Sequence, residues 1–319
     1  MESEPLFLID SFAQIYRGYH AVRFLSSPDG TPTNAVFAMT KFLLKLHKDY
    51  PSRSGAFVFD KGKPAFRMEL APDYKANRPP MPEDLRAQIP IIRELVQAFG
   101  WNIIEHEGYE ADDLIGSIAL GLRDFPVRIF SGDKDISQII DDRVTMLVPN
   151  PAGAVSIRGT AEVQEKFGVS PSAIPDYLAL IGDSSDNIPG IAGIGPKTAS
   201  ALLTQFGSGK NMYDHLDEIS RETLRKKLEG TREQFERNLK LVTLDLKPPE
   251  NKAWVPDDFI RKTPDWNKIR SIAEKLALRS IIKEIDEIAP AMEADLFAAP
   301  QKEPEKAPEP EQMTQMDLF

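Results

Sequence analysis

The sequence contains no cysteine among its 319 residues, and it has only four histidines. The absence of cysteine excludes disulfides, thiolate zinc sites, cysteine nucleophiles and thiol redox switches. The histidines are scattered along the chain without paired metal-ligand spacing, which argues against zinc hydrolase chemistry. Long apolar runs are also lacking, and the N-terminal MESEPLFLIDSF has no basic region, so neither a signal peptide nor a membrane span is expected. These absences predict a soluble, cytoplasmic protein without a membrane partner, and we expect it to be a monomer.

The remaining composition is that of an ordinary globular protein. Hydrophobic residues make up 41% of the chain and charged residues 28%, so a sizeable core can form. The length suggests one large domain or two smaller ones.

Positive charge is scarce overall, because the net charge is −10. Seven of these ten net negative charges come from residues 286–319, where nine acids accompany two lysines. If cations neutralise the acidic cluster described below, the rest of the chain is basic enough to bind a phosphate backbone. The acidic balance is therefore weak evidence against a nucleic-acid binder.

The first half of the chain alternates short apolar runs with helical periodicity. Strands are expected at Leu6–Ile9, Gly55–Phe59, Asn102–Glu105, Val127–Phe130 and Val144–Val148. Helices are expected at Asn34–His47, Pro82–Phe99, Ala111–Arg123 and Asp135–Ile140. Such alternation predicts an α/β fold with a mainly parallel sheet covered on both faces.

From about residue 160 the pattern becomes mainly helical. The expected helices are Thr160–Phe167, Ile174–Ile181, Thr198–Phe206, Arg221–Leu228, Arg232–Leu241 and Trp266–Leu278. Residues 289–311 are rich in Pro, Glu, Lys and Ala, a composition that predicts a disordered linker. We therefore expect three parts: residues 1–158, residues 159–288 and a tail at 289–319.

Nine acids form a candidate site, beginning with two that end predicted strands. They are Asp10, Asp60, Glu110, Asp112, Asp113, Asp133, Asp135, Asp183 and Asp186. Taken singly, each also fits a helix cap or a solvated surface. As a set they are harder to dismiss, because the carboxyl ends of parallel strands bring ligands to one edge of a sheet.

Carboxylates packed this closely repel one another unless hard cations intervene. Oxygen-only ligands favour Mg²⁺, for which Mn²⁺ can substitute. Two such ions are the usual device for in-line attack on a phosphodiester. The residues by themselves therefore predict metal-assisted phosphodiester hydrolysis.

Two further segments suit nucleic acid. IPGIAGIGPKTA places Gly190, Gly193 and Gly195 before Lys197 and Thr198, which is typical of a helix–hairpin–helix that holds a duplex backbone. An ordinary glycine-rich helix connection is the alternative. A phosphate-binding loop for nucleoside triphosphates does not fit, because Pro196 separates the last glycine from Lys197.

The second segment is residues 61–93, which carries seven basic and four acidic residues. Tyr74, Lys75 and Arg78 place an aromatic ring beside two cations, as suits a single strand of nucleic acid. A solvated loop is the alternative for this segment.

Together these residues resemble the 5′ nuclease family, which includes flap endonucleases and the 5′–3′ exonuclease domain of bacterial DNA polymerase I. The motifs are LIDSFAQIYRGYHA, VFD, FRMELAPDYKANR, GYEADD, SGDKD and GDSSDNIPGIAGIGPKTA, in the order of that family over about residues 5–285. The resemblance implies a Rossmann-like nuclease core, with an arch at about 61–93 over the site. It also implies a helix–hairpin–helix that binds duplex DNA together with a monovalent cation such as K⁺.

Residue roles follow from the same resemblance. Asp10, Asp60, Glu110 and Asp112 resemble the tighter metal site, and Asp133, Asp135, Asp183 and Asp186 the second, with Asp113 in support. Lys75 and Arg78 resemble the basic residues that contact the scissile phosphate, Tyr74 a stacking residue, and Arg67 a further DNA contact. Gly190, Gly193, Gly195, Lys197 and Thr198 fall in the duplex-binding hairpin.

The chain departs from the polymerase arrangement at its end, where a linker and tail follow residue 285. Its last residues, Gln315, Met316, Asp317, Leu318 and Phe319, resemble the peptide that binds the bacterial sliding clamp. Asp295-Leu296-Phe297 is a partial repeat without the glutamine, and the eukaryotic clamp-binding pattern fits less well.

Three functions are compatible with these motifs to different degrees. The favoured one is a stand-alone, clamp-recruited 5′ nuclease acting on a 5′ flap, a nick or an RNA primer end. A catalytically silent DNA-binding scaffold should have lost some of the nine acids, and none is missing. An RNA-directed nuclease of similar topology is disfavoured by the helix–hairpin–helix.

Overall fold

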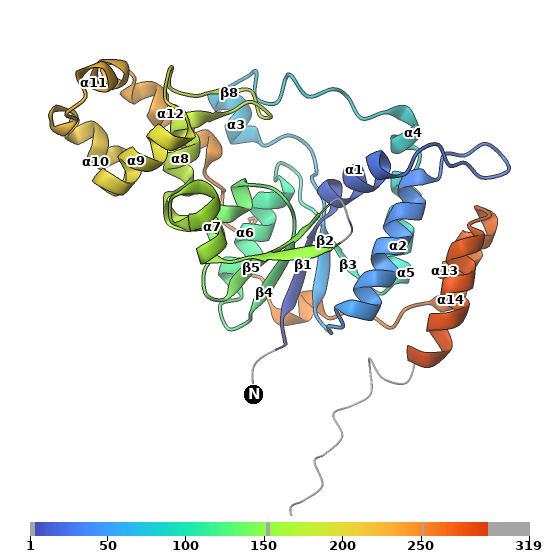
Figure 1. The fold of residues 1–319 in the computed structure, drawn as a ribbon. Coiled ribbons are helices and arrows are strands. Elements are labelled where there is room, and N and C mark those ends of the chain that lie inside the picture. The colour runs from blue at the N-terminus through green and yellow to red at the C-terminus, as the bar shows by residue number, and fades with distance from the viewer. Residues whose placement is uncertain (1–3, 151–153, 251, 293–319) are drawn as a thin grey trace, which may run out of the picture.

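The computed structural model describes residues 4–150, 154–250 and 252–292. Its main sheet has six strands in the order β3-β2-β1-β4-β5-β6 (Figure 1). They are β1 (Leu6–Asp10), β2 (Gly55–Val58), β3 (Asn102–Ile104), β4 (Val127–Phe130), β5 (Val144–Pro149) and β6 (Val155–Arg158). The first five pair in parallel, and only β6 is antiparallel. The predicted mainly parallel sheet is confirmed.

All five predicted strands are present, with ends that agree to within one residue. Strand β6 was not predicted, because it is an edge strand whose two central residues are exposed and which therefore has no apolar run. Two further short strands, β7 (Gly182–Asp183) and β8 (Ile188–Pro189), pair with each other. They form a hairpin within the segment that sequence patterning assigned to a glycine-rich connection.

The helices cover both faces of the sheet. The first six are α1 (Ser11–Ala21), α2 (Asn34–Asp49), α3 (Ala65–Leu70), α4 (Glu83–Arg86), α5 (Ile89–Ala98) and α6 (Ala111–Gly121). The later ones are α7 (Thr160–Phe167), α8 (Ile174–Ile181), α9 (Pro196–Phe206), α10 (Gly209–Asp214), α11 (Glu222–Leu228), α12 (Arg232–Val242), α13 (Trp266–Lys275) and α14 (Arg279–Met292). Short 3₁₀ turns are η1 (Asp135–Ile139), η2 (Pro171–Ala173), η3 (Leu216–Glu218) and η4 (Pro256–Phe259).

Two predicted helices differ from the structure. Residues 135–140 were predicted as a helix but form only the 3₁₀ turn η1. The pattern over Pro82–Phe99 predicted a single helix, whereas α4 ends at Arg86 and α5 begins at Ile89. Pro90 lies in the first turn of α5 and has no backbone N–H to continue the ladder from α4. The Gln88 side chain in the break accepts hydrogen bonds from two backbone N–H groups in the first turn of α2.

Alternate residues along a strand pack into two separate hydrophobic cores, one on each face of the sheet. Leu6 and Leu8 of β1 face one core, which includes α6 and the later helices α8, α9 and α12. Phe7 and Ile9 face the other, together with α2, α5 and α13 (Figure 1). A sheet buried on both faces needs apolar residues at every position, which is why these strands read as continuous apolar runs.

The expected linker begins inside a helix, because α14 continues to Met292. The rest of that linker and the terminal peptide 315–319 lie outside the described residues. The predicted boundary at 158/159 falls between β6 and α7, and the three-part division stays a prediction. Among the described helices, none has the length and apolar character that crossing a membrane requires.

Candidate active site

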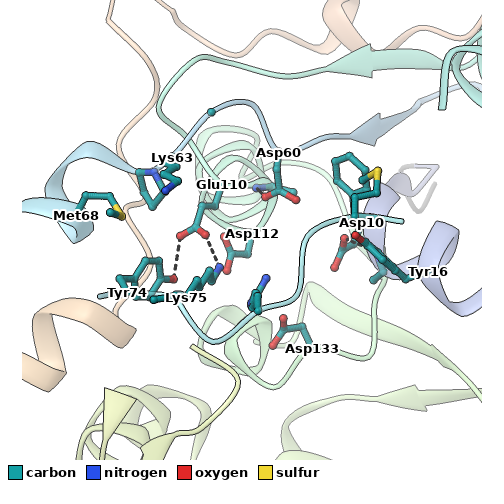
Figure 2. Close-up of a pocket in the computed structure, with 18 of the residues that line it drawn as sticks. Asp10, Tyr16, Asp60, Lys63, Met68, Tyr74, Lys75, Glu110, Asp112 and Asp133 are labelled. Atoms are coloured by element: carbon teal, nitrogen blue, oxygen red, sulfur yellow. Dashed lines mark hydrogen bonds and ion pairs between the residues drawn. The ribbon is translucent and has the colours of Figure 1, made fainter. Parts of the chain in front are cut away.

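A cleft of about 500 Å³ opens at the carboxyl edge of the parallel sheet. Five of the nine predicted acids line it, namely Asp10, Asp60, Glu110, Asp112 and Asp133 (Figure 2). The predicted arch segment contributes a wall through Lys63, Met68, Tyr74, Lys75 and Arg78. The sheet edge and the 61–93 segment therefore enclose the site from opposite sides.

Strand ends deliver three of the acids. Asp10 is the last residue of β1, while Asp60 and Asp133 follow β2 and β4 within three residues. Ser131 ties two of these ends together: its hydroxyl donates to Asp10 Oδ2 at 2.9 Å and accepts from the Asp133 backbone N–H at 3.0 Å. Sequence reasoning did not single out Ser131, although it lies in the SGDKD motif.

The start of α6 carries the next three acids. Glu110 is the N-cap residue, and Asp112 and Asp113 lie in the first turn, where the helix dipole favours negative charge. Asp60 Oδ1 accepts the Ala111 backbone N–H at 2.8 Å, which fixes the helix start against the end of β2. Glu110, Asp112 and Asp113 each offer a carboxylate oxygen within 4.8 Å of the others. We call these three the first cluster.

A second cluster consists of Asp135, Asp183 and Asp186, whose oxygens also lie within 4.8 Å of one another. It is built from η1 and from β7 with the loop after it. Asp135 Oδ1 is buried and has no hydrogen-bond partner among the described residues. A buried acceptor without a donor is rare in proteins and marks a place where a cation fits.

Burial and mutual repulsion raise the pKa values of several carboxylates at the site. Burial, reinforced by Asp60 and Asp133, raises the pKa of Asp10 to about 7. Burial also raises the pKa values of Asp60, Asp112 and Asp135, each with help from neighbouring acids. Hard divalent cations such as Mg²⁺ and Mn²⁺ prefer all-oxygen ligand sets of this kind. The residues therefore fit the ions that the sequence predicts.

Besides Arg67, which is described below, three cations contact the two clusters. Lys75 pairs with Glu110 (Figure 2) and lies 3.6 Å from Asp186 Oδ2. Arg78 pairs with Asp186 Oδ1. Lys134, which sequence reasoning overlooked, contacts Asp183 Oδ1 at 2.7 Å. Lys75 and Arg78 thus stand at the clusters, as their predicted role requires, and that role stays a prediction.

The arch segment is held at the site by backbone contacts with the second cluster's loop. The Lys75 N–H donates to the Asp186 carbonyl at 3.0 Å, and Asn77 Nδ2 donates to the Ser184 carbonyl at 2.7 Å. Asn187 Nδ2 donates back to the Asp73 carbonyl at 2.9 Å. Two motifs more than 100 residues apart in the sequence therefore form one unit.

Arg67, which was predicted to contact DNA, points into the protein interior, and its contact with DNA stays a prediction. Its side chain is only 2% exposed, and its guanidinium binds Asp113 at 2.6 and 2.8 Å and Glu110 at 2.7 Å. Its Nε donates to the Leu241 carbonyl on α12. Two buried carboxylates demand a buried counter-charge, and Arg67 supplies it. Asp113 is thereby held in support of the first cluster.

Tyr74, the expected stacking residue, contacts both clusters. The residue is 7% exposed, and its hydroxyl lies 3.1 Å from Glu110 Oε2 and 3.0 Å from Asp186 Oδ2. It therefore bridges the two clusters, and its stacking role stays a prediction. Phe12 and Tyr16 of α1 line the cleft as well, and they were missed because α1 itself was not predicted.

The predicted duplex-binding hairpin runs from β8 to the start of α9 (Figure 1). Gly190 is required by close approach, since a Cβ there would lie 2.2 Å from the Ile181 carbonyl oxygen. Gly193 has φ +73°, and a Cβ would meet Lys227 Nζ at 2.5 Å. Gly195 is the N-cap of α9, and the exposed Lys197 lies in its first turn, beside Thr198.

Lys227 of α11 was not predicted to take part in this hairpin. Its side chain lies across Gly193, with the ammonium 3.4 Å from that residue's carbonyl oxygen. Nothing in the local sequence could reveal this, because 34 residues separate the two positions.

A carboxylate-lined cleft with flanking Lys and Arg, at the carboxyl edge of a parallel sheet, is the arrangement of a metal-dependent phosphodiesterase. A family model for the 5′-3′ exonuclease N-terminal resolvase-like domain matches residues 5–168. A second model, for the 5′-3′ exonuclease C-terminal SAM fold, matches residues 169–266. The chain belongs to the 5′–3′ exonuclease family.

Relatives of two lengths are similar to this chain. The 5′-3′ exonuclease of Aquifex aeolicus is 37% identical over 291 residues, covering 89% of this chain and 96% of the relative. DNA polymerase I of Pseudomonas aeruginosa is 42% identical over 253 residues, covering 76% of this chain and 27% of the polymerase. The chain thus spans about a quarter of the length of the polymerase.

Solved structures share the fold. T5 5′-exonuclease with bound zinc has a TM-score of 0.62 at 22% identity, covering 89% of this chain and 99% of that one. The catalytic core of Rad2 in complex with a DNA substrate has a TM-score of 0.63 at 18% identity, covering 91% and 92%. At these identities the likeness concerns the fold alone, and it agrees with the predicted nuclease core and helix–hairpin–helix region.

Proposed function

We propose that this protein is a metal-dependent 5′–3′ exonuclease and 5′-flap endonuclease that hydrolyses phosphodiester bonds. The observation that carries the proposal is the pair of neighbouring carboxylate clusters, which Lys75 and Tyr74 bridge and whose Asp186 also pairs with Arg78. Membership of the 5′–3′ exonuclease family supports the reaction class. The 37% identity to a 5′-3′ exonuclease of nearly the same length supports it further.

The two clusters are proposed to hold two Mg²⁺ ions, or Mn²⁺ in their place. Asp10, Asp60, Glu110 and Asp112 would hold the tighter ion, and Asp133, Asp135, Asp183 and Asp186 the second, with Asp113 in support through Arg67. When bound, the ions supply an activated water and stabilise the departing oxygen. The carboxylate ligands lie close together before a metal ion binds, because strand ends and the α6 N-terminus fix their positions.

Lys75 and Arg78 act on the phosphate in this proposal. Their side chains are 22% and 51% exposed, and both stand at the rim of the clusters. A scissile phosphate entering the cleft can take over these cations from Glu110 and Asp186. Their charge then stabilises the negative charge that develops on the phosphate as the bond breaks.

The hairpin 190–198 is proposed to hold the duplex part of the substrate. The exposed Lys197 and the first turn of α9 offer a positive charge and backbone N–H groups to a phosphate. A K⁺ ion is proposed as an additional cation at the hairpin. Residues 1–158 would then form the catalytic part with its arch at 61–93, residues 159–288 the duplex-binding part, and residues 289–319 a tether.

The biological setting belongs to the same proposal. The substrates are DNA with a 5′ flap, a nick or an RNA primer end, met during replication and repair in the bacterial cytoplasm. Residues Gln315–Phe319 are proposed to dock on the sliding clamp, which would make the encounter with a nick effectively intramolecular. Deleting residues 315–319 should weaken clamp binding in a pull-down and leave cleavage in dilute solution intact. Unchanged clamp affinity would remove this part of the proposal.

The enzyme proposal is tested with a labelled 5′-flap duplex, incubated with Mg²⁺ or with EDTA. A short 5′ product near the junction, formed only with Mg²⁺, is the expected result. Asp217→Asn, at an exposed acid on η3, serves as the matched control for carboxylate substitutions in the cleft. Tight binding without cleavage in either Mg²⁺ or Mn²⁺ would overturn the enzyme and favour the DNA-binding scaffold.

A further inference from the structure

One cation at the site has no role in the function described so far. Lys134 lies between Asp133 and Asp135 in the sequence, immediately before η1. Its ammonium is 2.7 Å from Asp183 Oδ1, at the second cluster. Asp183 itself is only 4% exposed, whereas 32% of the Lys134 side chain is exposed.

The oxygen that Lys134 contacts is heavily used. Asp183 Oδ1 also accepts the Ser185 backbone N–H at 3.0 Å and the Ser185 hydroxyl at 2.6 Å. Asp186 is paired with Lys75 and Arg78, while Asp135 Oδ1 is buried without a partner in the described residues. Lys134 is therefore the cation that balances the Asp183 side of the second cluster.

The corresponding cation of the first cluster is fixed in place. Arg67 is 2% exposed, is bonded to two carboxylates and donates to two backbone carbonyls as well. Lys134 differs because its flexible four-carbon stem already reaches solvent. Its ammonium can therefore move from Asp183 into solvent when another cation takes its place.

We infer that Lys134 is a positioning residue that acts as a tethered counter-ion of the second metal site. It holds Asp183 next to Asp135 and Asp186 before a divalent ion binds, and it must move away from Asp183 when that ion arrives. The second ion therefore competes with the ammonium, and its site binds more weakly than the first. This inference rests on the proposed two-ion site.

The test is a calorimetric titration of the metal-free full-length protein with Mn²⁺. Lys134→Gln removes the charge and keeps most of the length, so the weaker Mn²⁺ should bind about ten-fold more tightly, as expected from losing one charge-assisted contact. Lys134→Arg keeps the charge and should retain the wild-type affinity. Lys252→Gln is the matched control, because Lys252 pairs with Asp258 at the same 2.7 Å and is similarly exposed, 37% against 32%.

A second readout separates positioning from a general change of charge. Without ions, Lys134→Gln should unfold at a temperature a few degrees below wild type, because Asp183 loses its counter-ion. With saturating Mg²⁺ the two melting temperatures should converge. Lys252→Gln should show the same difference from wild type with and without Mg²⁺.

The outcomes distinguish this inference from the proposed function. A wild-type protein that binds no Mn²⁺ at millimolar concentration would contradict the metal site itself. If wild type binds two ions but Lys134→Gln binds the second ion with unchanged or weaker affinity, the role of Lys134 is overturned and the metal site is not. Tighter second-ion binding together with Mg²⁺-dependent convergence of melting temperatures would support it.

Discussion

The two carboxylate clusters solve the same electrostatic problem in different ways. The first cluster is at the start of α6, and Arg67 neutralises it from a position with 2% exposure. The second cluster is built from a 3₁₀ turn and a hairpin loop, and Lys134 pairs with its Asp183 from a position with 32% exposure. Arg67 is buried and fixed by several bonds, whereas the partly exposed Lys134 is the cation that we infer to exchange with a metal ion.

Tyr74 and Lys75 connect the two clusters. They come from the segment that follows α3 and contact Glu110 of the first cluster and Asp186 of the second, while Arg78 of the same segment pairs with Asp186. This segment is also hydrogen-bonded to the loop of the second cluster. Its position therefore depends on both clusters, and a phosphate that binds Lys75 and Arg78 would weaken their hold on Glu110 and Asp186.

The largest expected effect comes from removing one acid of each cluster in turn. Asp112→Asn and Asp183→Asn should each lower flap cleavage by at least about a hundred-fold, because in-line attack needs both ions. Duplex affinity measured by fluorescence anisotropy should stay close to wild type, as it should for Asp217→Asn. Full activity in either cleft variant would refute the assignment of that cluster.

The fixed cation should matter for stability. Arg67→Met should lower the free energy of unfolding of the metal-free protein by about 3–5 kcal/mol, because Glu110 and Asp113 are left buried and unpaired. Urea denaturation followed by circular dichroism measures this. A variant of normal stability with weakened DNA binding would instead indicate that Arg67 contacts DNA. Arg67 would then not be the fixed counter-ion with which Lys134 is compared.

Lys75 should affect chemistry more than binding. Lys75→Ala is expected to lower the maximal cleavage rate by ten-fold or more, roughly, while the dissociation constant for the flap changes little, since the contact is strongest in the transition state. Single-turnover cleavage and anisotropy separate the two quantities. Lys48→Ala, at an exposed lysine of α2, is the control. A loss confined to affinity would count against the assigned role.

The pH dependence of stability tests whether burial and neighbouring acids raise the pKa of Asp10. The pKa of Asp10 rises from 3.8 to about 7 on folding, so the folded state binds the proton more tightly than the unfolded state. The metal-free protein should therefore lose stability as pH rises from about 4 to about 7. Thermal melts with EDTA should show this decline, and Asp10→Asn should reduce it. A flat profile in wild type would contradict the assigned crowding.

The smallest effect is expected at the hairpin. Lys227→Ala removes the charge that lies across Gly193 and should weaken duplex binding a few-fold. The slope of the logarithm of the binding constant against the logarithm of salt concentration should become shallower by about one unit. Lys226→Ala is a matched control on the same helix, where the ammonium pairs with Glu222 at 2.8 Å. Equal effects of the two substitutions would place Lys227 outside the DNA interface.

Sequence patterning predicted the acids better than it predicted their partners. Asp10, Asp60 and Asp133 could be found because apolar strands end beside them and parallel strands share an edge. Arg67 was assigned to DNA because nothing in a basic, loop-rich segment tells which cation folds inward. That direction depends on Asp113 and on the Leu241 carbonyl, which lie 46 and 174 residues away.

The same limit applies to Tyr74, Lys134 and Lys227. The sequence places Tyr74 beside two cations, but only tertiary packing turns its hydroxyl toward Glu110 and Asp186. Lys134 was not predicted because it lies between Asp133 and Asp135, and only the acids of that motif were assigned a role. Helix α1 was missed altogether, and the cleft-lining Tyr16 was missed with it.

The central claim is that two carboxylate clusters hold two catalytic ions. Counting the Mn²⁺ ions bound to wild type, Asp112→Asn and Asp183→Asn by calorimetry tests it most directly. We predict two ions in wild type, loss of the tighter ion in Asp112→Asn and loss of the weaker ion in Asp183→Asn. Unchanged stoichiometry and affinities in both variants would contradict the account.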